Sequence, residues 1–356
     1  MAEISVLQDL FDHNDWANRK VIALANELAA EQLDAQRAIG FGTLRNTLFH
    51  ILEAEKLWLE RWQAKPWRPL EADAGSMSVA DIGAAMVETA QERNQLLEED
   101  SKSNFERVVE FKDSRAESYS FPVGDLMSHV ANHGIHHRSQ ALQYLKGYER
   151  TIPGGLDYLF YKLAKPSCSQ PEESFAPIES YGLEIGRELG PATEFDKQRV
   201  QRYLDYSDWA MSRVYEEATG LSDEQLDQNF GIGMGTLRRN LQHINHAELW
   251  WLDCWQTDQA RFPSAEDSKS LSELRAEYES AAARRNEFCQ GLDAESASRV
   301  VSVAAGGPVT CFRVTESLLQ LACHGTHHRS QCVNILRQLG ITFSWIDLIV
   351  WIRENS

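Results

Sequence analysis

Histidines gather in a few short windows of this 356-residue chain, and their spacing is typical of metal-binding sites. Ten of the eleven histidines fall in four windows: His50, 129–137, 243–246 and 324–328. Residues four apart on a helix lie one turn apart on nearly the same face. If each pair lies on a helix, His133 with His137 and His324 with His328 therefore offer two imidazoles to one divalent ion.

A third ligand is available earlier in the chain. His50 precedes His133 by 83 residues and His243 precedes His324 by 81, so both sets have the same layout. Three neutral histidines leave at least one coordination position open, which is typical of catalytic rather than structural metal sites. The predicted metal ligands are His50, His133, His137, His243, His324 and His328.

The remaining residues of these windows are weaker candidates. His129 and His246 have no histidine at the equivalent position of the other half, which argues against a ligand role. His136 and His327 either hydrogen-bond the ligands or pack between helices, and both interpretations stay open. Cys323, next to a predicted ligand, is interpreted as a buried thiol.

An internal repeat accounts for the duplicated histidines. Three pairs of segments are alike at a nearly constant offset: 11–21 with 204–214, 42–59 with 235–252, and 133–140 with 324–331. The chain is therefore predicted to be a tandem duplication. Its domains are expected at 1–165 and 196–356, joined by a proline-rich linker at 166–195, where proline prevents helix continuation.

The elements that position the histidines are mainly helices. In the first half, apolar residues recur with helical spacing over four segments: 5–28, 43–63, 78–99 and 124–146. Two short alternating segments lie between the third and fourth of these, as in a hairpin, and the second half repeats the pattern. The predicted fold is all-α, with two tandem four-helix bundles that each carry a small β-hairpin between helices three and four.

Composition narrows the class of protein. The formal charge of −18 disfavours nucleic acid and anionic membranes as partners. No apolar stretch approaches the roughly 18–20 residues of a membrane span, and the N-terminus has no basic region like that of a secretory signal. We therefore expect a cytoplasmic protein that binds neither membrane nor nucleic acid, and whose six cysteines form no disulfides.

The motifs together resemble the DinB/YfiT-like superfamily of metal-binding four-helix bundles. They are D-W-A near the start of each half, G-T-L-x5-H on the second predicted helix, and H-x-x-H-H-R-x-Q on the fourth. The resemblance implies up to one divalent ion per bundle, zinc or nickel, with iron as an alternative. It also implies a small-molecule substrate, including low-molecular-weight thiols as cosubstrates. Because many relatives form homodimers, it implies an intrachain pseudo-dimer of the two bundles.

The expected function is that of a metal-dependent enzyme, a hydrolase or a thiol S-transferase. The ion would activate water or a low-molecular-weight thiol against a small electrophilic substrate. The catalytic residues are unknown; Glu55 and Glu248, each five residues after a predicted ligand, are the candidate bases, although solvated helix carboxylates are the more favoured interpretation. The alternative is a non-catalytic, metal-stabilised bundle that binds or senses a ligand.

Overall fold

The computed structural model describes most of the chain. The described residues are 4–65, 73–113, 115–153, 155–163, 192–257, 262–264, 269–303, 310–343 and 345–355. Cys168 and all but the last four residues of the predicted linker lie outside them. Helices dominate and the sheets are small two-stranded hairpins, so the predicted all-α fold class is confirmed.

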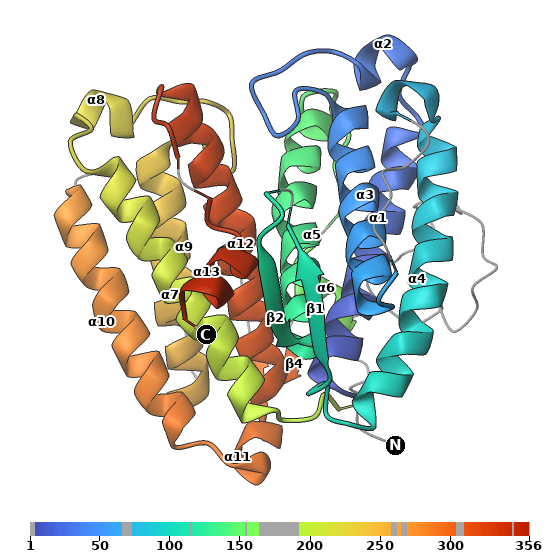
Figure 1. Ribbon diagram of the computed structural model, residues 1–356. Coiled ribbons are helices and arrows are strands. Elements are labelled where there is room, and N and C mark those ends of the chain that lie inside the picture. Colours follow the sequence, from blue (N-terminus) through green and yellow to red (C-terminus); the bar gives the residue numbers. More distant parts are fainter. Residues whose placement is uncertain are drawn as a thin grey trace. The chain divides into compact units, whose positions relative to one another are not determined.

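Four long helices form the first bundle (Figure 1): α1 (Val6–Ala25), α3 (Leu44–Trp62), α4 (Val79–Ser101) and α5 (Val123–Lys146). Two short helices lie between them: α2 (Ala30–Leu33) and the 3-10 helix η1 (Ala74–Ser76). A hairpin of β1 (Val108–Lys112) and β2 (Ser118–Pro122) precedes α5. In the hairpin, Val109 pairs with Phe121, and both side chains are buried. The antiparallel hairpin lies where the sequence predicted one, between helices three and four.

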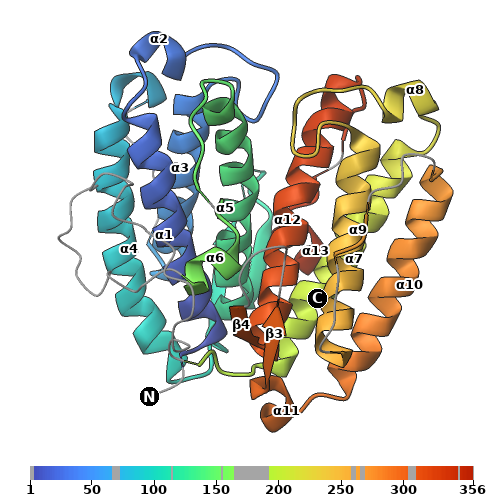
Figure 2. The same cartoon turned by 180° about the vertical axis from the view of Figure 1, so that it is seen from behind.

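The second bundle repeats this order (Figure 2): α7 (Lys197–Ala218), α9 (Leu237–Gln256), α10 (Leu271–Gln290) and α12 (Val314–Gln338). Its shorter elements are α8 (Asp223–Leu226), α11 (Ala294–Ser298), β3 (Val300–Val303) and β4 (Thr310–Arg313). Val301 pairs with Phe312 in this hairpin, as Val109 pairs with Phe121 in the first.

The second helix of each bundle begins at a threonine. Thr43 accepts a hydrogen bond from the backbone N–H of Asn46, which satisfies one of the free donors in the first turn of α3. Thr236 caps α9 in the same way, through the N–H of Arg239. These threonines belong to the repeated G-T-L motif, so the motif sets the start of the helix that carries the first histidine of each set.

An arginine after each cap ties that helix to the segment before it. The Arg45 guanidinium donates to both carboxylate oxygens of Asp34, at 2.7 and 3.1 Å. Arg238 makes the same fork to Asp227, also at 2.7 and 3.1 Å. Two parallel charge-assisted bonds fix orientation as well as distance. Both aspartates end the same sequence, E-Q-L-D, at 31–34 and at 224–227, so this repeated segment orients the helix that follows it.

The short helix after each bundle packs against the opposite repeat. Two compact units result. Among the described elements, the first unit holds α1–α5 with α13 (Leu348–Glu354), and the second holds α7–α12 with α6 (Tyr158–Leu163). In the first unit α13 lies against α5, and in the second α6 lies against α12. The predicted division at 166–195 follows the sequence repeat, whereas the compact units include these exchanged helices.

Polar contacts accompany both exchanged helices. Arg353 of α13 lies over the ring of Tyr119 at 4.1 Å and 3.4 Å from the Glu117 carboxylate, both on or beside the first hairpin. In the second unit, the Lys162 ammonium of α6 lies 3.3 Å from the buried Glu316 carboxylate of α12. The backbone N–H of Leu159 donates to the Gln320 side chain at 2.9 Å.

Within the described residues, no helix is long and apolar enough to cross a membrane.

Candidate metal centres

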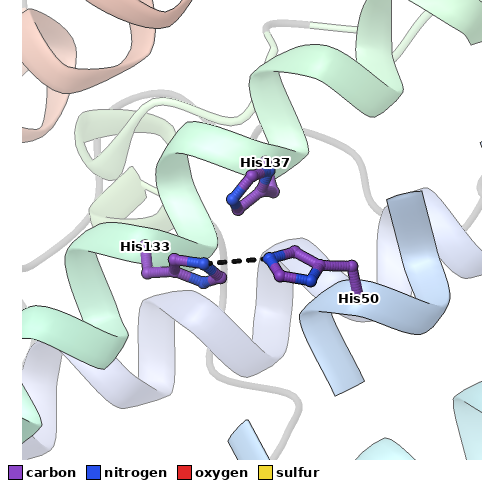
Figure 3. A group of neighbouring side chains, drawn as sticks. All are labelled: His50, His133 and His137. Atoms are coloured by element: carbon purple, nitrogen blue, oxygen red, sulfur yellow. Dashed lines mark hydrogen bonds between the residues drawn. The ribbon is translucent and has the colours of Figure 1, made fainter. Parts of the chain in front are cut away.

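Three histidines of the first bundle converge between α3 and α5, and they are called the first triad: His50, His133 and His137. Figure 3 shows His50 on α3 facing the two histidines, which project from successive turns of α5. The Nε2 atoms of His50 and His133 lie 3.2 Å apart, and one nitrogen from each of the three rings lies within 4.8 Å of the others. The structure therefore brings the three predicted ligands together.

The second bundle holds an equivalent group, the second triad: His243, His324 and His328. His243 comes from α9 and the other two come from successive turns of α12. The Nε2 atoms of His243 and His324 are 3.1 Å apart, and the three ligand nitrogens again lie within 4.8 Å of one another. All six predicted ligands are thus distributed as two triads of matching geometry.

The spacing of the nitrogens fits a shared ion. Two nitrogen ligands at about 2.0–2.1 Å from a tetrahedral ion lie about 3.3 Å apart. The observed separations of 3.2 and 3.1 Å are close to this value. Imidazole nitrogens are preferred ligands of zinc, nickel and iron, so the donor set also suits the predicted metals.

Burial keeps the imidazoles in the form that binds metal. It lowers the pKa of His50 and of His243 to about 4. It also lowers the pKa of His133, His324 and His328 well below the usual value, with repulsion from neighbouring histidines as the second cause. These five rings are therefore neutral at pH 7, with a lone pair available for coordination.

A glutamine orients the last histidine of each triad. The Nδ1 atom of His137 donates to Oε1 of Gln140 at 2.8 Å, and His328 makes the same bond to Gln331, also at 2.8 Å. A carbonyl oxygen can only accept, so the ring proton is held on Nδ1 and Nε2 is left as the ligand atom. These glutamines were not predicted as site residues, although the repeated H-H-R-x-Q motif contained them.

The glutamines also settle how the neighbouring histidines are used. Nε2 of Gln140 lies 3.2 Å from Nε2 of His136, and Nε2 of Gln331 lies 2.9 Å from Nε2 of His327. The amide donates, so each of these rings accepts at Nε2. His136 and His327 therefore contact the glutamine that orients a ligand, which favours the hydrogen-bonding interpretation in an indirect form.

Glu55 and Glu248 lie elsewhere. Both carboxylates are buried, and each forms an ion pair with an arginine of the third bundle helix rather than facing solvent. Glu248 lies 2.6 Å from Arg285, and Glu55 lies 3.6 Å from Arg93. They belong to neither triad, and the solvated-carboxylate interpretation is wrong for both.

The same ion pairs explain the repeated D-W-A motif. Arg93 also contacts Asp15 at 2.5 Å, and Arg285 contacts Asp208 at 2.7 Å. The aspartate of the motif, the glutamate of the second helix and the arginine of the third thus form one buried network in each bundle. Because a buried arginine is stabilised only when its charge is paired, this network holds the helices that frame each triad.

The other singled-out residues stay outside the triads. His129 and His246 are buried and belong to neither ligand group, in agreement with their lack of a repeated partner. Cys323 is buried beside His324, as interpreted, and is not among the grouped ligands. No disulfide joins the described cysteines.

Comparison with known proteins gives one family match. The model of the DinB family matches residues 4–173 and again residues 195–354. No curated protein and no solved structure matches the chain. The two matched regions confirm the tandem duplication that was predicted from the sequence. The chain therefore belongs to the DinB family, with one family domain in each half.

Proposed function

We propose that each bundle binds one divalent ion through its triad, and that the two centres catalyse attack of water or a low-molecular-weight thiol on a small electrophilic substrate. The observation that carries the proposal is the pair of triads, each with two Nε2 atoms 3.1–3.2 Å apart. Both triads are kept with the same geometry although many other positions differ between the two repeats, which supports a shared function. Zinc or nickel is the expected ion, with iron as the alternative.

The protein's own residues would prepare the centre. Three neutral imidazoles would hold the ion and leave a coordination position for a further ligand. A bound divalent ion lowers the pKa of water or of a thiol towards neutrality, which makes either a better nucleophile at pH 7. Gln140 and Gln331 keep one ligand ring of each triad in the correct tautomer throughout.

A non-catalytic role is the second candidate. It is favoured by the position of Glu55 and Glu248, because the two carboxylates considered as bases are engaged by buried arginines. The residues grouped with each triad in the described part of the chain are histidines alone. Such a centre would bind its ion and stabilise the bundle, or sense a ligand, without a protein group to move protons.

Metal analysis of purified protein tests the ligand assignment. We expect two ions per chain in the natural protein, one after His133→Ala with His137→Ala, and none when His324→Ala and His328→Ala are added. His129→Gln is the matched control, because it changes a histidine on α5 to the residue of the second repeat and should leave two ions bound. Unchanged stoichiometry in the four-residue variant would refute the assignment.

Activity measurements then separate the two candidates. The metal-loaded protein is assayed with a series of small esters, amides and thiol-reactive electrophiles, with and without a low-molecular-weight thiol. Turnover by the natural protein that is lost in the four-residue variant supports the catalytic role. If the ion raises the melting temperature and no substrate is converted, the non-catalytic role is the better description. The charge of −18 and the sequence pattern support a cytoplasmic protein without nucleic acid as a partner.

A further inference from the structure

Large apolar side chains are left exposed beside both triads. In the described part of the chain, six such side chains are exposed: Phe41, Val108, Met234, Phe262, Val300 and Trp345. Phe41 and Met234 occupy the same place in the two repeats, on the loop before the second helix. Phe262 follows that helix in the second repeat. Half of the exposed apolar side chains therefore belong to segments that border the helix carrying the first ligand.

Phe41 lies directly on the first triad. Its ring stacks on that of His50, with centroids 3.8 Å apart and planes inclined by 28°, and it lies 5.4 Å from the ring of His137. The side chain nevertheless remains 42% exposed. One face of the phenyl ring thus covers a metal-ligating imidazole while much of the rest is open to solvent.

The backbone holds Phe41 in this place. Gly40 has a φ of +50°, and a Cβ there would lie 2.6 Å from Oε1 of Gln140, the glutamine that orients His137. Only glycine permits both this conformation and this close approach. The Tyr144 hydroxyl donates to the carbonyl of Ile39 at 2.7 Å, which fixes the residue just before Gly40. Phe41 is therefore presented by a loop seated on the site itself.

The second repeat presents an apolar surface by a related arrangement. Gly233 has a φ of +56° and is packed against Gln331, as Gly40 is packed against Gln140. Met234 therefore lies on the loop of the second repeat that is equivalent to the loop carrying Phe41. Phe262 adds a ring whose centroid lies 5.6 Å from His243 and 5.7 Å from Trp250. Met234 and Phe262 are 43% and 41% exposed, close to the value for Phe41.

Small-molecule sites combine apolar and aromatic side chains with a few polar groups, and an exposed ring beside each triad provides the apolar part of such a site. We propose that each centre takes a substrate with an apolar group, aromatic or alkyl, beside the atom that reacts at the ion. Phe41 in the first repeat, and Phe262 with Met234 in the second, are the residues that select this group. The inference rests on the proposed function, because it requires an ion on the triads.

Two hydroxamates test the inference at the first triad, since they share a metal-binding head and differ in the attached group. Binding of benzohydroxamate and acetohydroxamate is measured by calorimetry on zinc-loaded protein that carries His324→Ala and His328→Ala. We expect the aromatic probe to bind more tightly. Phe41→Ser should reduce that preference by roughly two- to tenfold, the range of an aromatic pair. The affinity for acetohydroxamate and the zinc stoichiometry should stay the same.

Two further variants make the result specific. Val108→Ser removes another exposed apolar side chain of the same unit, on β1, and should leave the preference unchanged. Phe41→Tyr keeps an aromatic ring and should retain most of it. Equal binding of the two probes, or an unchanged preference in Phe41→Ser, would overturn the inference while leaving the zinc site intact. Absence of bound zinc in the starting protein would overturn the proposed function together with it.

Discussion

Replacing Gln140 with leucine should weaken metal binding at the first triad and leave the second unaffected. The Oε1 atom of Gln140 accepts from Nδ1 of His137 at 2.8 Å inside the bundle. Without this acceptor the ring proton either stays on Nδ1 without a hydrogen-bond partner or moves to Nε2, the atom that must bind the ion. Loss of such a contact typically lowers metal affinity 10- to 100-fold, about 1.4–2.7 kcal/mol.

The assay is a competition titration against a chromophoric chelator, performed in protein whose second triad is removed by His324→Ala and His328→Ala. Gln140→Glu is the informative partner variant, since it keeps an oxygen that accepts from His137 and should retain the affinity within a few-fold. Gln143→Leu changes a buried glutamine of the same helix that makes no hydrogen bond to a triad histidine within the described part of the chain, and is the matched control. An undiminished affinity in Gln140→Leu would refute the role assigned to this hydrogen bond.

Three further predictions concern stability. Arg285→Met should destabilise the protein by about 3–5 kcal/mol, because it leaves the buried Glu248 carboxylate without its counter-charge, while zinc still binds the second triad. Ile352→Ala, in the buried face of α13, should cost about 2–5 kcal/mol and speed amide exchange in α5 rather than in α12. Asp157→Asn should stabilise the protein at pH 7 by about 1–3 kcal/mol, because burial raises the pKa of Asp157 to about 6 from 3.8.

The measurements for these variants are urea unfolding, metal analysis and hydrogen exchange. For Asp157 the sign follows from the raised pKa: the protonated form is favoured in the folded state, so its penalty is absent below pH 3.8 and complete above pH 6. Asp157→Asn should therefore flatten the fall in stability between these values. Loss of zinc in Arg285→Met, or faster exchange confined to α12 in Ile352→Ala, would contradict the stated roles.

The triads could be predicted from the sequence because local rules determine them. A spacing of four residues puts His133 and His137 on one helix face whatever surrounds the helix. The repeat then supplied the third ligand, because His50 precedes its pair by 83 residues and His243 precedes its pair by 81. Helix caps are equally local: Ser78 and Asp81 form a capping box at the start of α4, as their spacing of three residues allows.

The candidate bases show where this reasoning was incomplete. Glu55 follows His50 by five residues, which turns its side chain about 140° around the helix from the ligand. That direction leads towards α4 and Arg93 rather than towards α5. The rotation could have been worked out from spacing alone, but the arginine that meets the carboxylate comes from a different helix and needed the tertiary structure.

The exchanged helices could not have been predicted from local sequence. α6 and α13 are short and apolar on one side, and either bundle offers a fourth helix on which such a segment can pack. The choice depends on long-range contacts such as Lys162 with Glu316 in one unit and Arg353 with Glu117 in the other. Neither pair stands out in the sequence, because partners so far apart carry no spacing rule.

The two units agree closely in the residues that would hold an ion and differ in the residues around them. The nitrogen separations within the triads and the glutamine contacts agree between units to about 0.1 Å. The surroundings differ. Met234 stands in the second unit where Phe41 stands in the first, and Phe262 is an additional apolar residue of the second unit. Glu55 accepts hydrogen bonds from two asparagines, whereas Oε2 of Glu248 has no hydrogen-bond partner in the described part of the chain. If the histidines served packing alone, they would have been as free to change as these neighbours. Their matching geometry instead supports ion binding in both units, and the differing apolar residues predict that the two centres select different substrates.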